Sequence, residues 1–181
     1  MAGSARPARA RCVPGRAALT DSPRVMMMVA MSSSRTLPRV DDFNFHCLVD
    51  VRFRDLDAMG HVNNAAYLTF FEVARAEYMR ALGHAEPDAP MAELFPFILA
   101  EVSCRYLAPA SLGDRLRVYL RTTRFGTKSF DFEYLICHQD TGTPIAFGRS
   151  QQVYFDYAAQ QTLPVPATFR SRVERLEDRA S

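Results

Sequence analysis

The sequence predicts an α+β fold in which one long helix packs against an antiparallel sheet of five or six strands. One long segment carries apolar residues at the three- and four-residue spacing of a helix that is buried on one face. Five shorter segments alternate apolar and polar residues, and the last four of them follow one another across short turns. This hairpin succession favours α+β over the strict alternation of a parallel α/β fold. A chain of 181 residues is long enough for one such domain.

The first strand is predicted over residues 43–53. Apolar side chains occupy its odd positions, and polar or charged side chains occupy most of the even positions. A period of two places one set of side chains on the buried face of a sheet. The predicted buried set is Phe43, Phe45, Cys47, Val49, Val51 and Phe53.

The long helix is predicted to follow after a polar turn and to run for about five turns. Asn63 or Asn64 can cap its first turn, and Gly83 can end it. The apolar stripe that would face the sheet consists of Tyr67, Phe70, Phe71, Ala74, Tyr78 and Leu82.

Four further strands are predicted in the second half of the chain. They cover 98–106, 116–120, 130–136 and a run from about 144 to 155, with turn signals between them. A short helix over 167–178 is mostly charged, and we expect it to lie on the surface.

The formal charge of +2 hides two regions of opposite sign. Residues 1–40 contain seven Arg and one Asp, so +6, and the remaining 141 residues contain 15 basic and 19 acidic side chains, so −4. Three interpretations of the first region compete: a transit-type presequence, a nucleic-acid-binding arm, and a disordered basic extension with no selected role. We favour the third, and we expect a domain over 41–166 and a charged helix or tail over 167–181.

The cysteines and the hydropathy of the chain indicate in which compartment it works and whether it holds a metal. The four cysteines lie far apart, and no pair or Cys/His cluster has zinc spacing. No apolar run approaches the length of about 18 residues that a membrane-spanning helix needs. We therefore expect a reduced, cytoplasmic protein without a metal or a membrane span. Nucleic acid is not an expected partner because the predicted domain is acidic.

The loop between the first strand and the long helix is the most unusual stretch. It gathers Asp55, Asp57, His61, Asn63 and Asn64 around a glycine. One interpretation is a connection whose Asp and Asn residues form turns and caps. The other is a reactive site, because a carboxylate and an imidazole would lie just before a helix N-terminus, where free N–H groups favour the oxyanion of an ester or thioester.

The motif RFRDLDAMGHVNNAAYLTFFEVARAEYM (52–79) resembles the signature of the hotdog-fold acyl-CoA thioesterases of the 4-hydroxybenzoyl-CoA thioesterase-like superfamily. The segments 105–116, 126–134 and 153–157 extend the resemblance over nearly all of 43–166. It implies a long helix wrapped by an antiparallel sheet. It also implies homodimers or homotetramers with active sites between subunits, in which residues such as 95–108 of a second chain complete the pocket.

By position, the resemblance assigns roles to residues of the loop. Asp57 matches the catalytic aspartate, Gly60 the glycine of the same loop, and Tyr67 the aromatic residue at the start of the helix. Asn64 matches the position whose backbone N–H polarises the thioester carbonyl. Some members have His or Tyr there, but a backbone donor survives that exchange. A further resemblance to plant acyl-carrier-protein thioesterases supports Asp57 and His61 as catalytic residues, although Met59 occupies the position of the Asn in that motif. The alternative for His61 is a structural loop histidine.

The remaining binding candidates are polar residues beside this motif and at a distant turn. We expect Asn63 to bind the substrate, together with Gly60 and Tyr67. Arg121, Arg124 and Lys128 flank the turn at Gly126, and we interpret them either as phosphate ligands or as a solvated hairpin. On the long helix, Glu72 and Arg75 are spaced for an ion pair, which we favour over a catalytic role.

Together these features predict an enzyme that hydrolyses acyl-CoA or acyl-carrier-protein thioesters. Asp57 would act as a general base or as a nucleophile, and the helix N-terminus at Asn64 would hold the oxyanion. No cofactor is expected, since coenzyme A is part of the substrate. The alternative is a hotdog module that binds acyl thioesters without hydrolysing them.

Overall fold

The computed structural model describes residues 36–83 and 94–178 of the chain. One compact unit begins at Leu37 and includes all of the secondary structure that is described. Most of the predicted basic extension over 1–40 lies outside the described residues. In chain order the elements are η2 (Val40–Asp42), β1 (His46–Asp50), η3 (Phe53–Asp55), α1 (Asn64–Ala81), β2 (Phe97–Tyr106), β3 (Arg115–Phe125), β4 (Ser129–His138), β5 (Pro144–Asp156), β6 (Gln161–Thr162) and α3 (Ala167–Asp178).

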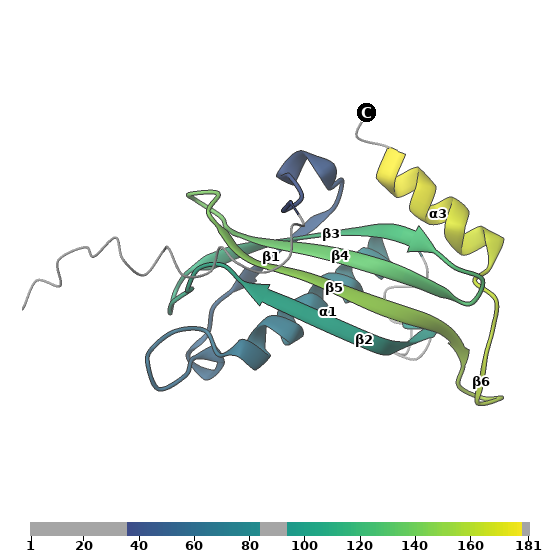
Figure 1. The fold of residues 1–181 in the computed structure, drawn as a ribbon, viewed down its shortest axis with the longest axis horizontal. Coiled ribbons are helices and arrows are strands. Elements are labelled where there is room, and N and C mark those ends of the chain that lie inside the picture. The colour runs from purple at the N-terminus through teal and green to yellow at the C-terminus, as the bar shows by residue number, and fades with distance from the viewer. Residues whose placement is uncertain (1–35, 84–93, 179–181) are drawn as a thin grey trace, which may run out of the picture. The chain divides into compact units, whose positions relative to one another are not determined.

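The strands form one antiparallel sheet in the order β1-β3-β4-β5-β2, with the short β6 paired to β5 (Figure 1). The hairpins β3–β4 and β4–β5 follow the chain. By contrast, β1 and β2 are separated in sequence by α1 and lie at opposite edges of the sheet. The predicted α+β class and the long helix are therefore confirmed, and so are the hairpins that join the last three predicted strands. The predicted hairpin between β2 and β3 is wrong, because β2 pairs with β5 and β3 pairs with β1.

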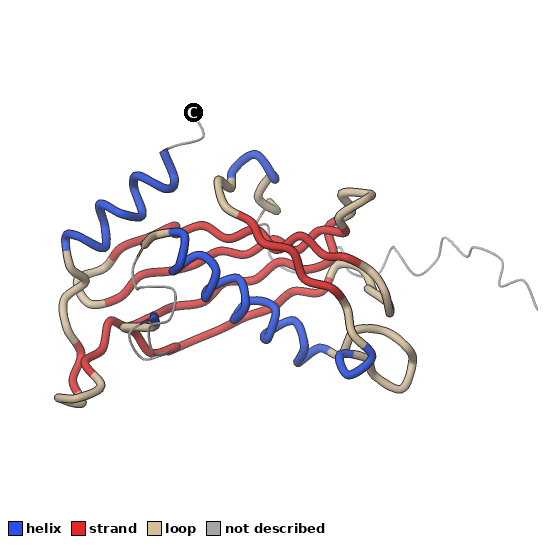
Figure 2. Tube along the Cα trace, turned by 180° about the vertical axis from the view of Figure 1, so that it is seen from behind, coloured by secondary structure: helices blue, strands red, loops and turns tan. Residues whose placement is uncertain are grey.

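Helix α1 runs along one face of this sheet, from the loop after β1 to the opposite end of the strands (Figure 2). Every residue of its predicted apolar stripe is buried. The ring of Phe71 stacks on Tyr134 of β4 with centroids 4.3 Å apart. Gly148 of β5 makes room for that ring, since a Cβ atom there would lie 2.4 Å from Phe71. The helix and the sheet thus enclose the core, whose fully buried aromatic residues include Phe71, Tyr78, Phe130, Phe132 and Tyr134.

The ends of α1 match the predicted signals. Asn63 is the N-cap, and its side chain accepts a hydrogen bond from the Ala65 N–H at 2.9 Å. Gly83 follows the last turn with φ +62°, a left-handed conformation that glycine adopts without steric cost. This fixes Asn64 as the first residue of the helix.

The first strand is shorter than predicted, and two of its aromatic residues lie elsewhere. Phe43 precedes β1 and packs in a separate cluster with Tyr119, Leu135 and Cys137. Phe53 lies in the 3-10 helix after the strand and is 81% exposed, so the prediction that it is buried is wrong. The reason is local: the Asp55 carboxylate accepts a hydrogen bond from the Arg52 N–H and turns the chain out of the sheet.

The C-terminal helix has the predicted bounds but is not a loose surface helix. Phe169 and Val173 are buried in the main core, while the opposite face of α3 is charged and exposed. Phe169 packs against Phe130 with ring centroids 5.0 Å apart. A period of 3.6 residues places these two apolar residues on one face, which the high overall charge conceals in the sequence. None of the helices among the described residues is long and apolar enough to cross a membrane.

Candidate active site

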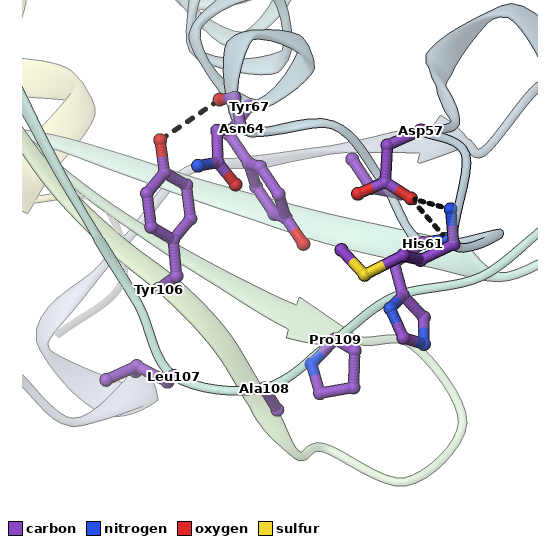
Figure 3. Close-up of a pocket in the computed structure, with 10 residues that line it drawn as sticks. Asp57, His61, Asn64, Tyr67, Tyr106, Leu107, Ala108 and Pro109 are labelled. Carbon is purple, nitrogen blue, oxygen red and sulfur yellow. Dashed lines mark hydrogen bonds between the residues drawn. The ribbon is translucent and has the colours of Figure 1, made fainter. Parts of the chain in front are cut away.

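A pocket of about 300 Å³ opens where α1 begins and β2 ends (Figure 3). The loop before α1 forms one wall, and the segment that follows β2 forms the other. The lining residues are Asp57, Met59, His61, Val62, Asn64, Tyr67, Tyr106, Leu107, Ala108 and Pro109. Four of the predicted site residues, Asp57, His61, Asn64 and Tyr67, are therefore brought together here.

Asp57 is held by its own loop. Its Oδ1 accepts hydrogen bonds from the N–H of Met59 at 2.8 Å and of His61 at 3.2 Å. Its backbone N–H donates to the His61 carbonyl at 2.8 Å, which closes the loop. Within the described part of the chain, Oδ2 has no hydrogen-bond donor. One carboxylate oxygen therefore fixes the side chain, and the other remains available to a water or a substrate.

Asn64 lines the same pocket and has a free backbone donor. As the first residue of α1 it has no intrahelical acceptor for its N–H, and none is found elsewhere among residues 36–83 and 94–178. Its carbonyl accepts a hydrogen bond from the Tyr106 hydroxyl at 3.1 Å. The aligned peptide dipoles give this end of the helix a partial positive charge. The donor is therefore suited to a carbonyl oxygen that gains negative charge.

His61 contributes its backbone, rather than its ring, to the geometry of Asp57. The side chain is exposed, and in Figure 3 the imidazole extends away from the carboxylate. No hydrogen bond of the imidazole is found within the described residues. A catalytic role for the ring stays a prediction.

Tyr67 forms a buried wall of the pocket. Its ring is 3% exposed and contacts the ring of Tyr106 edge-on at 5.2 Å. Burial raises the pKa of Tyr67 to about 12, with the nearby Cys104 and Tyr106 adding to the effect. The hydroxyl is therefore neutral at physiological pH and can serve as a hydrogen-bonding group, but not as a base.

Gly60 and Asn63 shape the loop without lining the pocket. Gly60 has φ +80° and donates its N–H to the Asp57 carbonyl at 3.1 Å, closing a turn that a side chain would strain. The Asn63 side chain is occupied as the helix cap. Contact of either residue with the substrate stays a prediction.

The three predicted phosphate ligands do not line this pocket. Arg121 donates to Glu133 at 2.6 and 3.0 Å, Arg124 lies 3.8 Å from Asp131, and Lys128 donates to the hydroxyl of Thr162 at 2.9 Å. They lie toward the end of β3 and the turn after it, near the last turns of α1, because Tyr78 contacts the neighbouring Thr122. Binding of phosphate by these cations stays a prediction.

Sequence reasoning expected residues such as 95–108 at the pocket only as a contribution of a second chain, whereas here Tyr106 and residues 107–109 of the same chain line it. The alternation along the strand placed Tyr106 on the helix-facing side, but no spacing rule brings the end of β2 to the start of α1. That proximity depends on the crossing of helix and strand in three dimensions. Among the described residues no group of three or more His, Cys, Asp or Glu side chains could hold a metal ion.

A curved antiparallel sheet packed on one long helix, with a carboxylate and a helix N-terminus at a shared pocket, defines a hotdog-fold protein equipped for acyl transfer to water. The model of the Thioesterase-like superfamily matches residues 51–173, and the chain belongs to that superfamily. The resemblance stated from the sequence is confirmed, and with it the prediction of an enzyme of the thioester hydrolase class.

Two relatives and one solved structure show what the chain is similar to. "Acyl-CoA thioester hydrolase YbgC" of Escherichia coli O6:H1 is 34% identical over 96 residues, which are 53% of this chain and 71% of that protein. "Uncharacterized protein YsmA" of Bacillus subtilis is 30% identical over 93 residues, 51% of this chain, and the alignment spans only 60% of that relative. The crystal structure of a Thermus thermophilus thioesterase complexed with coenzyme A and Zn superposes with a TM-score of 0.67 at 36% identity, covering 77% of this chain and 98% of that one.

Proposed function

We propose that this protein hydrolyses acyl-CoA thioesters to the free acid and coenzyme A. The observation that carries the proposal is the shared pocket of the free Asp57 carboxylate oxygen and the free Asn64 N–H. The names of the YbgC relative and of the coenzyme A complex support acyl-CoA as the substrate class. An acyl-carrier-protein thioester is the second substrate that we would test, because it presents the same carbonyl.

The proposed mechanism follows from the two groups. The thioester carbonyl oxygen accepts a hydrogen bond from the Asn64 N–H, where the helix end stabilises the oxyanion by about 3 kcal/mol. As a base, Asp57 takes a proton from a water that attacks the carbonyl carbon. As a nucleophile, it forms a mixed anhydride that water then opens. In both cases the carbon–sulfur bond breaks, and the thiolate of coenzyme A leaves and is protonated. These steps use no cofactor, and the absence of one stays a prediction.

The test is release of free thiol from a panel of acyl-CoA thioesters by the wild type and by Asp57→Asn. Asparagine keeps an oxygen that can accept from the Met59 and His61 N–H groups, so the loop is retained while the charge is lost. Asp140→Asn, an exposed turn residue, is the matched control. We expect loss of turnover in Asp57→Asn alone. Full activity in a folded Asp57→Asn protein would refute the role of Asp57. Tight thioester binding without turnover by the wild type would favour the non-catalytic module.

We also propose that the active form is a homodimer or a homotetramer. β2 is an edge strand whose outer side has no partner strand among the described residues. Two of its residues, Leu99 and Tyr106, are 45% and 40% exposed. An unpaired strand edge with apolar side chains favours association with a second copy. Sedimentation equilibrium measures the state directly, and a monomer at assay concentration would contradict this proposal. The cytoplasmic location stays a prediction.

A further inference from the structure

A second pocket of about 270 Å³ lies farther along the same helix. The middle of α1 forms one wall of this pocket, and the start of β2 forms another. Tyr157, which follows β5, completes the lining. The lining residues are Glu72, Arg75, Phe95, Phe97, Ile98, Leu99 and Tyr157. Five of the seven are apolar or aromatic, so the single buried cation, Arg75, dominates the chemistry of this pocket.

Arg75 is a buried charge without an acidic partner in the part of the chain that the structure describes. Its side chain is only 7% exposed, and none of the ion pairs among the described residues includes it. The predicted pair with Glu72 is therefore not formed. Instead Nη1 donates to the Tyr134 hydroxyl at 3.2 Å, and that hydroxyl lies 2.7 Å from the Ser150 Oγ. A buried network thus holds the guanidinium in place from the sheet side.

The remaining donors of Arg75 are not fully buried. Nε and Nη2 have no acceptor within residues 36–83 and 94–178, yet they are not among the buried side-chain atoms left unsatisfied there. These two nitrogens therefore keep some exposed surface, and Arg75 lines the pocket. Glu72 lines the same pocket but is exposed, so water screens its charge more strongly than that of the buried guanidinium.

The two pockets lie on one side of α1. Arg75 follows Asn64 by about three helical turns, or roughly 16 Å along the axis, so both residues lie on nearly the same face of the helix. The partly exposed Leu68 lies between them on this face. A thioester whose carbonyl is held at the Asn64 N–H can therefore direct its acyl chain along α1 and β2 toward Arg75 (Figure 2).

We propose that Arg75 binds the far end of the acyl group and selects acyl chains that end in a carboxylate. The inference rests on the proposed thioester hydrolysis and adds a substrate class to it. A carboxylate accepts two N–H bonds from one guanidinium edge, and it neutralises a buried charge that has no acidic partner among the described residues. The apolar and aromatic walls would cover the methylene chain that leads to it.

The experiment compares acyl-CoA thioesters that end in a carboxylate with methyl-ended thioesters of the same chain length. The readout is the ratio of kcat/KM for each matched pair, measured across a series of lengths. We expect the ratio to favour the carboxylate by about ten- to a hundred-fold at the length that spans the two pockets. A ratio near one at every length would overturn the proposal.

Two variants locate the preference at Arg75. Arg75→Gln removes the charge, and Leu99→Glu keeps Arg75 but supplies a carboxylate from the half-exposed wall of the pocket. Both should bring the ratio close to one. Arg80→Gln, an exposed arginine on the same helix, is the control and should keep the wild-type ratio. Because Leu99 also lies on the strand edge proposed for self-association, sedimentation equilibrium must show that Leu99→Glu keeps the oligomeric state of the wild type. If that folded variant keeps the preference, Arg75 is not its source, whatever happens to the stability of Arg75→Gln.

A binding measurement separates this inference from the proposed reaction. Non-hydrolysable thioether analogues of the same matched pairs are titrated into the wild type by calorimetry. Tighter binding of the carboxylate-ended analogue, lost in Leu99→Glu, supports the role of Arg75 even if no thioester is hydrolysed. Equal binding of the two analogues, as expected if a second copy of the chain fills this pocket, would refute it.

Discussion

The carboxylate of Glu177 on α3 accepts a hydrogen bond of 2.7 Å from the buried hydroxyl of Tyr78 on α1. The same oxygen accepts from the Thr122 N–H of β3 at 3.1 Å. One side chain near the end of the chain therefore joins the C-terminal helix to the core helix and to the sheet. Burial raises the pKa of Glu177, although the hydrogen bonds from Tyr78 and Thr122 act in the opposite direction.

Two substitutions of Glu177 should distinguish the free energy that its hydrogen bonds contribute to stability from the free energy that is lost by burying its charge. Glu177→Ala loses both acceptor contacts and is expected to lower the free energy of unfolding by about 1–3 kcal/mol. Glu177→Gln keeps an acceptor oxygen without the charge, so it should be at least as stable as the wild type at neutral pH. Urea denaturation measures both variants, and Glu177→Gln as unstable as Glu177→Ala would contradict this account.

The difference in stability between the wild type and Glu177→Gln should change with pH in a defined direction. The pKa of Glu177 is higher in the folded protein than in the unfolded chain, so its stabilising contribution is complete below the unfolded value and is lost as pH rises through the folded value. The stability advantage of Glu177→Gln should therefore shrink to nothing as the pH is lowered through this window. An advantage that grows on acidification would show that the shift has the opposite direction.

The backbone donor at Asn64 can be removed without disturbing the helix. Proline is favoured at the first helical position, and Asn63 already has the extended conformation (φ −60°, ψ 141°) that a residue before proline requires. Asn64→Pro should keep the melting temperature but lower kcat by about 100- to 1000-fold, the usual effect of losing one oxyanion donor. Asn64→Ala retains the N–H, and its kcat should fall far less. Equal losses in the two variants would assign the effect to the side chain.

Phe43 should stabilise the fold although it lies outside every strand. Its ring is 7% exposed, packs on Tyr119 and lies beneath the Arg121 guanidinium, 4.9 Å from the centroid. Phe43→Ala is expected to cost about 3 kcal/mol. Phe53→Ala, at a position that is 81% exposed, should change stability by less than about 0.5 kcal/mol. Thermal denaturation of the two variants distinguishes this packing from the prediction by alternation, which treats both rings alike.

Gly148 should tolerate no side chain while Phe71 is present. An added Cβ would lie 2.4 Å from the Phe71 ring, so Gly148→Ala is expected to cost about 1–3 kcal/mol by overpacking. Phe71→Leu removes the ring edge, and in that background the added methyl group should cost less. A double-mutant cycle measures the coupling, and purely additive losses would show that the clash is relieved elsewhere.

Periodicity determined the secondary structure of this protein because burial on one face imposes a local pattern. The stripe from Tyr67 to Leu82 and its caps at Asn63 and Gly83 are complete within the helix itself, so the sequence alone located α1. Phe43 and Phe53 fit the alternation predicted for the first strand, but both lie outside β1. A period of two contains no information about where the chain turns out of the sheet.

The candidate site divides in the same way. The loop that holds Asp57 and Asn64 is contiguous in sequence, so its residues and their spacing could be recognised there. Tyr106 at the pocket and Arg75 in the second pocket depend on which strand lies beside α1, and that is decided by the order β1-β3-β4-β5-β2. Pairing of distant strands depends on the joint packing of the whole core. Only the tertiary structure therefore shows that Arg75, although spaced for an ion pair with Glu72, does not form it. Arg75 instead lines a pocket beside the proposed path of the acyl chain.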